Sequence, residues 1–165
     1  MPPKFAIYCR VSTEEQTTEN QRLILVEYAE RRGFNYEVFE EVESTRNTRP
    51  LKQKLLGRLR AMEFDGLLVL KLDRWARSLR ELTLELEEIH AKGVTFISLN
   101  DSIDMSTATG RLQFQILSAF AEFERNLISE RTKEGLARAR KQGKRLGRPP
   151  GSKDKKPRKR RRNDR

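Results

Sequence analysis

The sequence has very few residues of the types that build disulfides and metal sites. Its 165 residues include one cysteine, Cys9, and one histidine, His90. A disulfide within the chain is therefore impossible, and one chain cannot supply the ligands of a zinc cluster. A Ser-His-Asp triad would need His90, which lies in the middle of a predicted helix, far in sequence from the predicted strand ends. We expect neither a metal site nor histidine-based catalysis.

Long apolar runs are also missing. No apolar segment approaches the length of a membrane-spanning helix, and the N-terminus lacks the basic and apolar regions of a signal peptide. The sequence contains no GxxxxGK[ST] and no GxGxxG motif, so it implies neither a nucleoside triphosphate nor a dinucleotide cofactor. We expect a soluble cytoplasmic protein of a reducing compartment, without a membrane partner and without a cofactor.

The charge of the chain is strongly uneven. Its formal net charge is +11, with 35 Lys and Arg residues against 24 Asp and Glu residues. Residues 141–165 contain 13 of the basic residues and two of the acidic ones, so residues 1–140 are neutral overall. A neutral domain followed by a cationic tail indicates binding to nucleic acid or to an anionic membrane surface.

Short apolar runs alternate with helical patterns over the first 99 residues. This alternation predicts an α/β fold with a mainly parallel sheet of about four to five strands flanked by helices, followed by a long C-terminal α-helix. Capping boxes at Thr18 and Ser78 are predicted to open two of the helices. The strands are predicted at residues 4–9, 36–42, 66–72 and 94–99, and the helices at residues 19–32, 51–62 and 79–92.

Residues 109–142 contain no proline, and their apolar residues recur at three- and four-residue spacing. A helix of about 33 residues would be about 50 Å long, which exceeds the width of a domain of about 100 residues. Either the helix breaks at Gly135, or its apolar stripe pairs with a second subunit while its C-terminal end reaches DNA. We predict an α/β domain over 1–108, a dimerisation and DNA-contacting helix over 109–143, and a basic DNA-binding tail over 144–165.

Arginines follow three of the four predicted strands. The carboxyl ends of parallel strands meet at one edge of the sheet, where ligands bind. Several guanidinium groups gathered beside one hydroxyl would repel one another unless an anion lies among them, and their planar forks fit phosphate. Phosphoryl transfer depends mainly on positioning and charge stabilisation, which fixed cations can supply. The residues behind the strands are Arg10 and Ser12, then Arg46 and Arg49, then Asp73, Arg74 and Arg77, and finally Asp101 and Asp104.

Five segments resemble the serine recombinase family of resolvases and invertases. In chain order they are YCRVSTEEQ, TRPLKQKLL, LKLDRWARS, IDMSTATGRL and AEFERNLISERTKEGLARARKQGK. The resemblance implies that Ser12 attacks a DNA phosphodiester and forms a 5′-phosphoseryl link beside a free 3′-hydroxyl. It implies that the scissile phosphate is bound and polarised by Arg10, Arg49, Arg74 and Arg77, with Asp73 orienting an arginine or aiding proton transfer. The implied accessory residues of the active site are Gln16, Gln21, Arg46, Glu124 and Arg125.

Two points stay open at this stage. The group that takes the proton of Ser12 is either a neighbouring arginine or Asp73. In the family a helix-turn-helix domain usually follows the long helix, but the residues after Gly151 include no apolar side chain other than Pro157. We therefore expect no such domain here, and expect the GRPP segment and the tail to contact the minor groove. The predicted DNA-binding residues are Arg138, Lys144, Arg145, Arg148 and Lys153.

The resemblance also implies the partners. It predicts double-stranded DNA as the substrate, a homodimer that forms a synaptic homotetramer, and a place at the nucleoid; an accessory protein stays unknown. One alternative is a non-catalytic DNA-binding or regulatory protein that keeps the fold, although binding alone would not need the hydroxyl of Ser12. Another is a phosphatase for small esters, which would explain neither the basic tail nor the long helix.

Overall fold

The computed structural model describes residues 1–11, 15–42, 49–144, 146 and 147. The chain divides into two compact units, Met1–Glu124 and Arg125–Arg165, and each is described by itself. The predicted domain boundaries after residues 108 and 143 stay predictions.

The first unit is built on a five-stranded sheet with the strand order β2-β1-β3-β4-β5. Strands β1, β2, β3 and β4 run parallel to their neighbours, and β5 pairs antiparallel with β4. This confirms the predicted mainly parallel α/β fold; the two-residue β5 is too short to show a sequence pattern of its own. The strands are β1 Lys4–Val11, β2 Asn35–Val42, β3 Gly66–Val69, β4 Thr95–Ser98 and β5 Ile103–Asp104.

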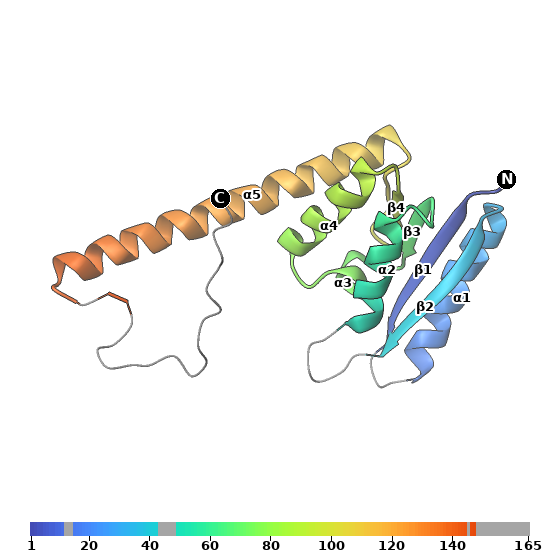
Figure 1. The fold of residues 1–165 in the computed structure, drawn as a ribbon, viewed down its shortest axis with the longest axis horizontal. Helices are drawn as coiled ribbons and strands as arrows, with labels where there is room; N and C mark the ends of the chain where they lie inside the picture. The colour runs from blue at the N-terminus through green and yellow to red at the C-terminus, as the bar shows by residue number, and fades with distance from the viewer. Residues whose placement is uncertain (12–14, 43–48, 145, 148–165) are drawn as a thin grey trace, which may run out of the picture. The chain divides into compact units, whose positions relative to one another are not determined.

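Five helices accompany these strands (Figure 1). The Ser78 hydroxyl accepts the N–H of Glu81 and opens α4, as predicted. The predicted start at Thr18 was wrong, because α1 begins at Glu15. The apolar run 66–72 was predicted as one strand, but β3 ends at Val69 and Leu72 begins a short helix. The helices are α1 Glu15–Arg31, α2 Pro50–Arg60, α3 Leu72–Trp75, α4 Leu79–Ala91 and α5 Ala108–Lys141.

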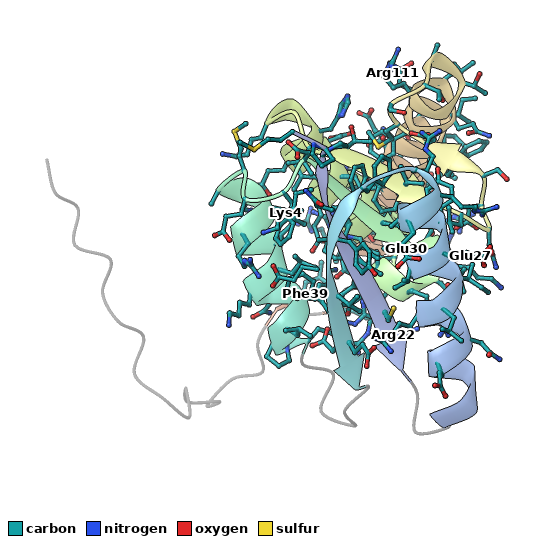
Figure 2. All side chains as sticks on the ribbon, turned by 90° about the vertical axis from the view of Figure 1, so that its right-hand side faces the viewer. Lys4, Arg22, Glu27, Glu30, Phe39 and Arg111 are labelled. Atoms are coloured by element: carbon teal, nitrogen blue, oxygen red, sulfur yellow. The ribbon has the colours of Figure 1, made fainter. Side chains whose placement is uncertain are left out.

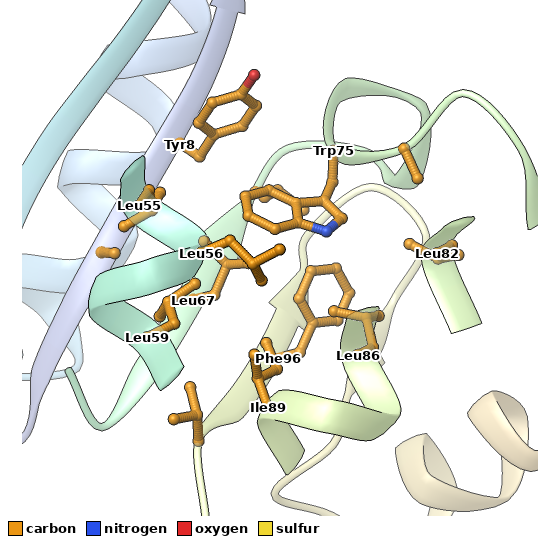
Figure 3. Packing of buried hydrophobic residues seen from close by; sticks show 14 of the residues in the cluster. Tyr8, Leu55, Leu56, Leu59, Leu67, Trp75, Leu82, Leu86, Ile89 and Phe96 are labelled. Carbon is orange, nitrogen blue, oxygen red and sulfur yellow. The ribbon is translucent and has the colours of Figure 1, made fainter. Parts of the chain in front are cut away.

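Successive side chains of a strand point to opposite faces, so the sheet has apolar side chains on both faces. Helices pack on each of these faces. On β1, Phe5 and Ile7 pack with α1, whereas Tyr8 packs with the cluster under α2 and α4. Figure 2 shows α1 on one side of the sheet and Phe39 of β2 on the side of α2. In the cluster under α2 and α4, the indole of Trp75 lies among residues of these two helices (Figure 3).

Helix α5 is continuous through Gly135, so the alternative of a break at this residue was wrong. One glycine inside a helix costs only about 1 kcal/mol, which a long helix can tolerate. The helix ends before Gly143, whose φ of +67° suits a glycine, and the Gly143 N–H donates to the carbonyl of Arg140. Within the described part of the chain, no helix is both long and apolar enough to cross a membrane.

Candidate active site

Three parallel strands bring their carboxyl ends to the same edge of the sheet. Arg10 lies near the end of β1, opposite Glu41 of β2, and is half-buried. Helix α3 follows β3 after two residues. Asp101 follows β4, and its Oδ2 accepts the Leu72 N–H at 2.7 Å and the Ser98 hydroxyl at 2.6 Å. Asp101 thus holds the start of α3 against the end of β4.

Arg49 is the most deeply buried of the predicted arginines that the structure describes, with 8% of its surface exposed. It directly precedes Pro50, the first residue of α2. Its Nη1 donates to the carbonyl oxygen of Trp75 at 2.6 Å. Its Nε and Nη2 are buried and have no hydrogen-bond partner among the described residues. Two donor groups of a buried cation are therefore free to bind an anion.

The Tyr8 hydroxyl and the Glu41 carboxylate form a hydrogen-bonded pair beside the start of α2. The Tyr8 hydroxyl donates to Oε2 of Glu41 at 2.5 Å, and the same carboxylate accepts the N–H groups of Leu51 and Lys52 in the first turn of α2. Burial raises the pKa of Tyr8 far above its usual range, and the hydrogen bond to Glu41 raises it further. The positive charges of Arg49 and Arg10 act in the opposite direction.

Lys52 is buried beside Arg49, with only 3% of its surface exposed. Its ammonium group forms ion pairs with Glu81 at 2.6 Å and Glu85 at 2.8 Å, both on α4. Burial by itself raises the pKa of the Glu81 carboxyl. The hydrogen bonds from Lys52 and from the Arg77 N–H, which donates at 2.9 Å, outweigh that effect and hold the pKa below its usual value.

Asp73 and Arg74 lie on α3, and α3 packs against β1. The Nε of Arg74 is 3.8 Å from Oδ1 of Asp73, and Arg74 is half-buried while Asp73 is exposed. This contact is an ion pair that is longer than a charge-assisted hydrogen bond. Arg77, just before α4, is exposed.

A cleft of about 130 Å³ opens beside these groups. Arg49 and Arg77 both line it, so arginines from separate loops border one opening. The rest of its wall is formed by Lys52, Gln53, Leu56, Glu81 and Glu85. Among the residues that the structure describes, no group of three or more His, Cys, Asp and Glu side chains could hold a metal ion.

The structure describes some of the predicted site residues and not others. Arg10 lies two residues after Tyr8 on β1, and Arg49 and Arg77 share the cleft. Gln21 is buried on α1, and Glu124, Arg125, Arg138 and Lys144 are exposed. Ser12, Arg46, Arg145, Arg148, Lys153 and the side chain of Gln16 lie outside the described residues.

Sequence reasoning missed the buried polar contacts around the start of α2. Lys52 and Tyr8 lie in two of the segments that carry the family resemblance, but no role was predicted for them or for Glu41, and their partners lie 29 or more residues away or on another element. Glu81 was predicted only as part of the capping box that opens α4. A charged Glu41 at the end of a strand that packs into the core was the one available signal.

Comparisons with known proteins give a consistent result. The family model described as "Resolvase, N terminal domain" matches residues 5–145. The chain is 44% identical over 144 residues to the "Serine recombinase gin" of Escherichia phage Mu, covering 87% of this chain and 71% of the relative. It is 46% identical over 144 residues to the "DNA-invertase" of Enterobacteria phage P7, covering 87% of this chain and 74% of the relative.

The fold has solved counterparts as well. The crystal structure of the N-terminal catalytic domain of TP901-1 integrase matches with a TM-score of 0.66 and 39% sequence identity. The match covers 75% of this chain and 98% of that domain.

Proposed function

The chain belongs to the resolvase family of serine recombinases, and on this premise we propose that it cuts and rejoins DNA through a covalent bond to Ser12. Its activity as a site-specific DNA recombinase follows from the family, and the resemblance in the sequence is confirmed.

In the proposed step the Ser12 oxygen attacks the phosphorus of a DNA phosphodiester. The bond between phosphorus and the 3′ oxygen breaks, a bond between Ser12 Oγ and the 5′ phosphate forms, and the 3′ oxygen leaves as a hydroxyl after taking up a proton. Either Asp73 takes the proton of Ser12, or a neighbouring arginine takes it after giving its own proton to the leaving 3′ oxygen, so that the arginine is again a cation at the end of the step. One phosphodiester replaces another, so rejoining by the reverse reaction needs no ATP. Arg10, Arg49, Arg74 and Arg77 stabilise the charge that spreads over the phosphate oxygens.

The observation that supports this proposal most strongly is that the buried Arg49 side chain has hydrogen-bond donors without partners among the described residues. A buried cation with unused donor groups is unfavourable unless an anion compensates it. Arg49 keeps Nε and Nη2 without a hydrogen-bond partner among the described residues, beside a cleft that Arg77 also lines. A phosphate oxygen would satisfy these donors, because the planar guanidinium fork matches phosphate.

The test is formation of a covalent protein–DNA complex on a supercoiled plasmid that carries candidate sites. We expect the complex to survive denaturing electrophoresis with protein on the 5′ ends, and Ser12→Ala to abolish it while DNA binding stays within about twofold, since the hydroxyl makes the bond and the cations make the affinity. A non-catalytic DNA-binding protein would form no complex at all. Cleavage at the wild-type rate by Ser12→Ala would remove Ser12 from its role.

We extend the proposal to a homodimer that assembles into a synaptic homotetramer, because each chain has one Ser12 and recombination requires four strand cuts. Several large apolar side chains on α5 are exposed, among them Ile116 and Phe120, which also line an apolar groove of about 280 Å³ with Ile103 and Leu117. A second copy would cover this surface. Sedimentation of the wild type and of Phe120→Glu tests it: a wild-type dimer that the charge separates supports the proposal, and a wild-type monomer overturns it.

The basic end of the chain is proposed to add phosphate contacts that hold the enzyme on DNA at the nucleoid. Three basic residues, Arg138, Arg140 and Lys141, occupy the last turn of α5, and the cationic tail follows. Deleting residues 144–165 should weaken DNA binding and lower the slope of log affinity against log salt concentration by about 0.9 for each lost phosphate contact. An unchanged salt slope would contradict a role of the tail in binding.

A further inference from the structure

We infer that Lys52, which takes no direct part in the proposed chemistry, is a positioning residue that fixes the guanidinium of Arg49 for the reaction. The inference rests on the proposed function, because it assigns Arg49 to the scissile phosphate. Lys52 is uncommon because it is a lysine on α2 with only 3% of its surface exposed, in a region that buries Glu41 and Arg49 as well as apolar residues.

The contacts of Lys52 run between helices. Its ammonium group pairs with Glu81 and Glu85 at 2.6 and 2.8 Å, so one side chain of α2 links this helix to α4. A buried ion pair adds little net stability, because desolvation offsets the attraction, and apolar residues of similar volume often fill such a site equally well. We therefore expect the ion pairs of Lys52 to affect the positions of neighbouring groups rather than the free energy of unfolding.

Trp75 connects Lys52 to Arg49. The Lys52 ammonium lies 4.9 Å from the centroid of the Trp75 ring, and the Trp75 carbonyl oxygen accepts the hydrogen bond of Arg49 at 2.6 Å. The tryptophan also packs edge-on against Tyr8, with ring centroids 5.2 Å apart. If the ammonium is lost, the ring loses its contact on one side, and the acceptor that holds Arg49 can shift.

The same lysine also reaches the segment that carries Arg77. The Glu81 carboxylate that binds Lys52 through Oε1 accepts the Arg77 N–H through Oε2. Arg49 and Arg77 line one cleft, and Lys52 lies in its wall. The Lys52–Glu81 pair thus sets the separation between two loops that each contribute a guanidinium group.

The experiment is a double-mutant cycle in the full chain, read as the single-turnover rate of covalent complex formation on DNA. Lys52→Met and Arg49→Lys are made singly and together, and Lys54→Met at an exposed position of the same helix is the matched control. A displacement of about 1 Å in a positioned group can reduce a rate about 10²-fold. We expect a loss of that order for Lys52→Met alone, a much smaller further loss in the Arg49→Lys background, and no loss for Lys54→Met.

Two further measurements separate positioning from folding. Trp75 is the only tryptophan in the sequence, so its fluorescence should change in Lys52→Met and return in part in Lys52→Arg, together with the rate. DNA affinity should stay at the wild-type value in both. If Lys52→Met does not fold, Lys52→Met with Glu85→Gln replaces it, since this variant removes one charge of each sign and leaves less uncompensated charge.

The outcomes distinguish this inference from the proposed function. Ser12-dependent complex formation at the wild-type rate in Lys52→Met overturns the inference alone. An equal loss in both Arg49 backgrounds also overturns it, because Lys52 would then act independently of Arg49. If the wild type forms no covalent complex, or Ser12→Ala still forms one, the proposed function fails first.

Discussion

The two faces of the sheet bury very different side chains. Beneath α1, the cluster of Phe5, Ile7, Cys9, Leu25 and their neighbours is apolar, and α1 itself buries the uncharged amide of Gln21. The face beneath α2 and α4 buries apolar residues too, but also Arg49, Lys52 and Glu41. The difference indicates a division of roles. The α1 face mainly stabilises the fold, while the opposite face also accepts the desolvation cost of charged groups that the proposed chemistry uses.

Cys9 and Tyr8 show the same contrast on neighbouring residues of one strand. Burial raises the pKa of the Cys9 thiol to about 12, so the thiol stays protonated at neutral pH and acts as a small apolar side chain. Tyr8, on the other face, donates its hydroxyl to a buried carboxylate that also caps α2. In Figure 3 this hydroxyl points away from the apolar cluster.

The largest effect is expected from Arg49→Ala, which removes a charged side chain from the face beneath α2 and α4. Removing one donor that stabilises transition-state charge reduces a rate by about 10²–10³-fold, and we expect at least this loss in covalent complex formation. The free energy of unfolding should change by less than about 2 kcal/mol, because the lost hydrogen bond to Trp75 is offset by removal of a guanidinium with unused donors. Single-turnover kinetics and urea unfolding measure the two quantities. A loss of unfolding free energy as large as the rise in activation free energy would contradict the division of roles.

Leu25→Ala should give the reverse result on the apolar face. Leu25 is fully buried, and truncating such a leucine costs about 2–5 kcal/mol of unfolding free energy. The folded fraction should still form the covalent complex at the wild-type rate. Leu23→Ala, at an exposed position of the same helix, is the matched control and should leave stability nearly unchanged. A rate that falls in proportion to stability would mean that both faces act on the site.

The smallest effect is expected from the acid limb of stability. The folded state lowers the pKa of Glu81 below its usual value of about 4.5. Its contribution is therefore fully present above pH 4.5 and is lost as the pH falls through the lower pKa of the folded state. The stability difference between wild type and Glu81→Gln should shrink as the pH falls from 5 to 3, as urea unfolding at each pH would show. Glu87→Gln, at an exposed position of α4, is the control; a difference that grows on acidification would contradict the assigned pairing.

Local sequence patterns predicted the helices and strands well. They could not predict contacts between residues that lie far apart in the sequence. The Ser78 capping box marked the start of α4 because its hydrogen bond closes within three residues. At Leu72 the sequence misled, because a buried strand and a buried short helix show the same apolar run. The arginines behind the strands were predicted from parallel topology alone. Lys52 could not be, since a lysine is normally exposed and its partners lie on another helix.

The most direct test of the account is to identify the residue that becomes joined to DNA. Protease digestion of the covalent complex followed by mass spectrometry locates the linked peptide and the DNA end that it carries. The account predicts a phosphodiester at Ser12 on the 5′ end of the cut strand, with a free 3′-hydroxyl on the other side. A link at any other residue, or at a 3′ end, would contradict it.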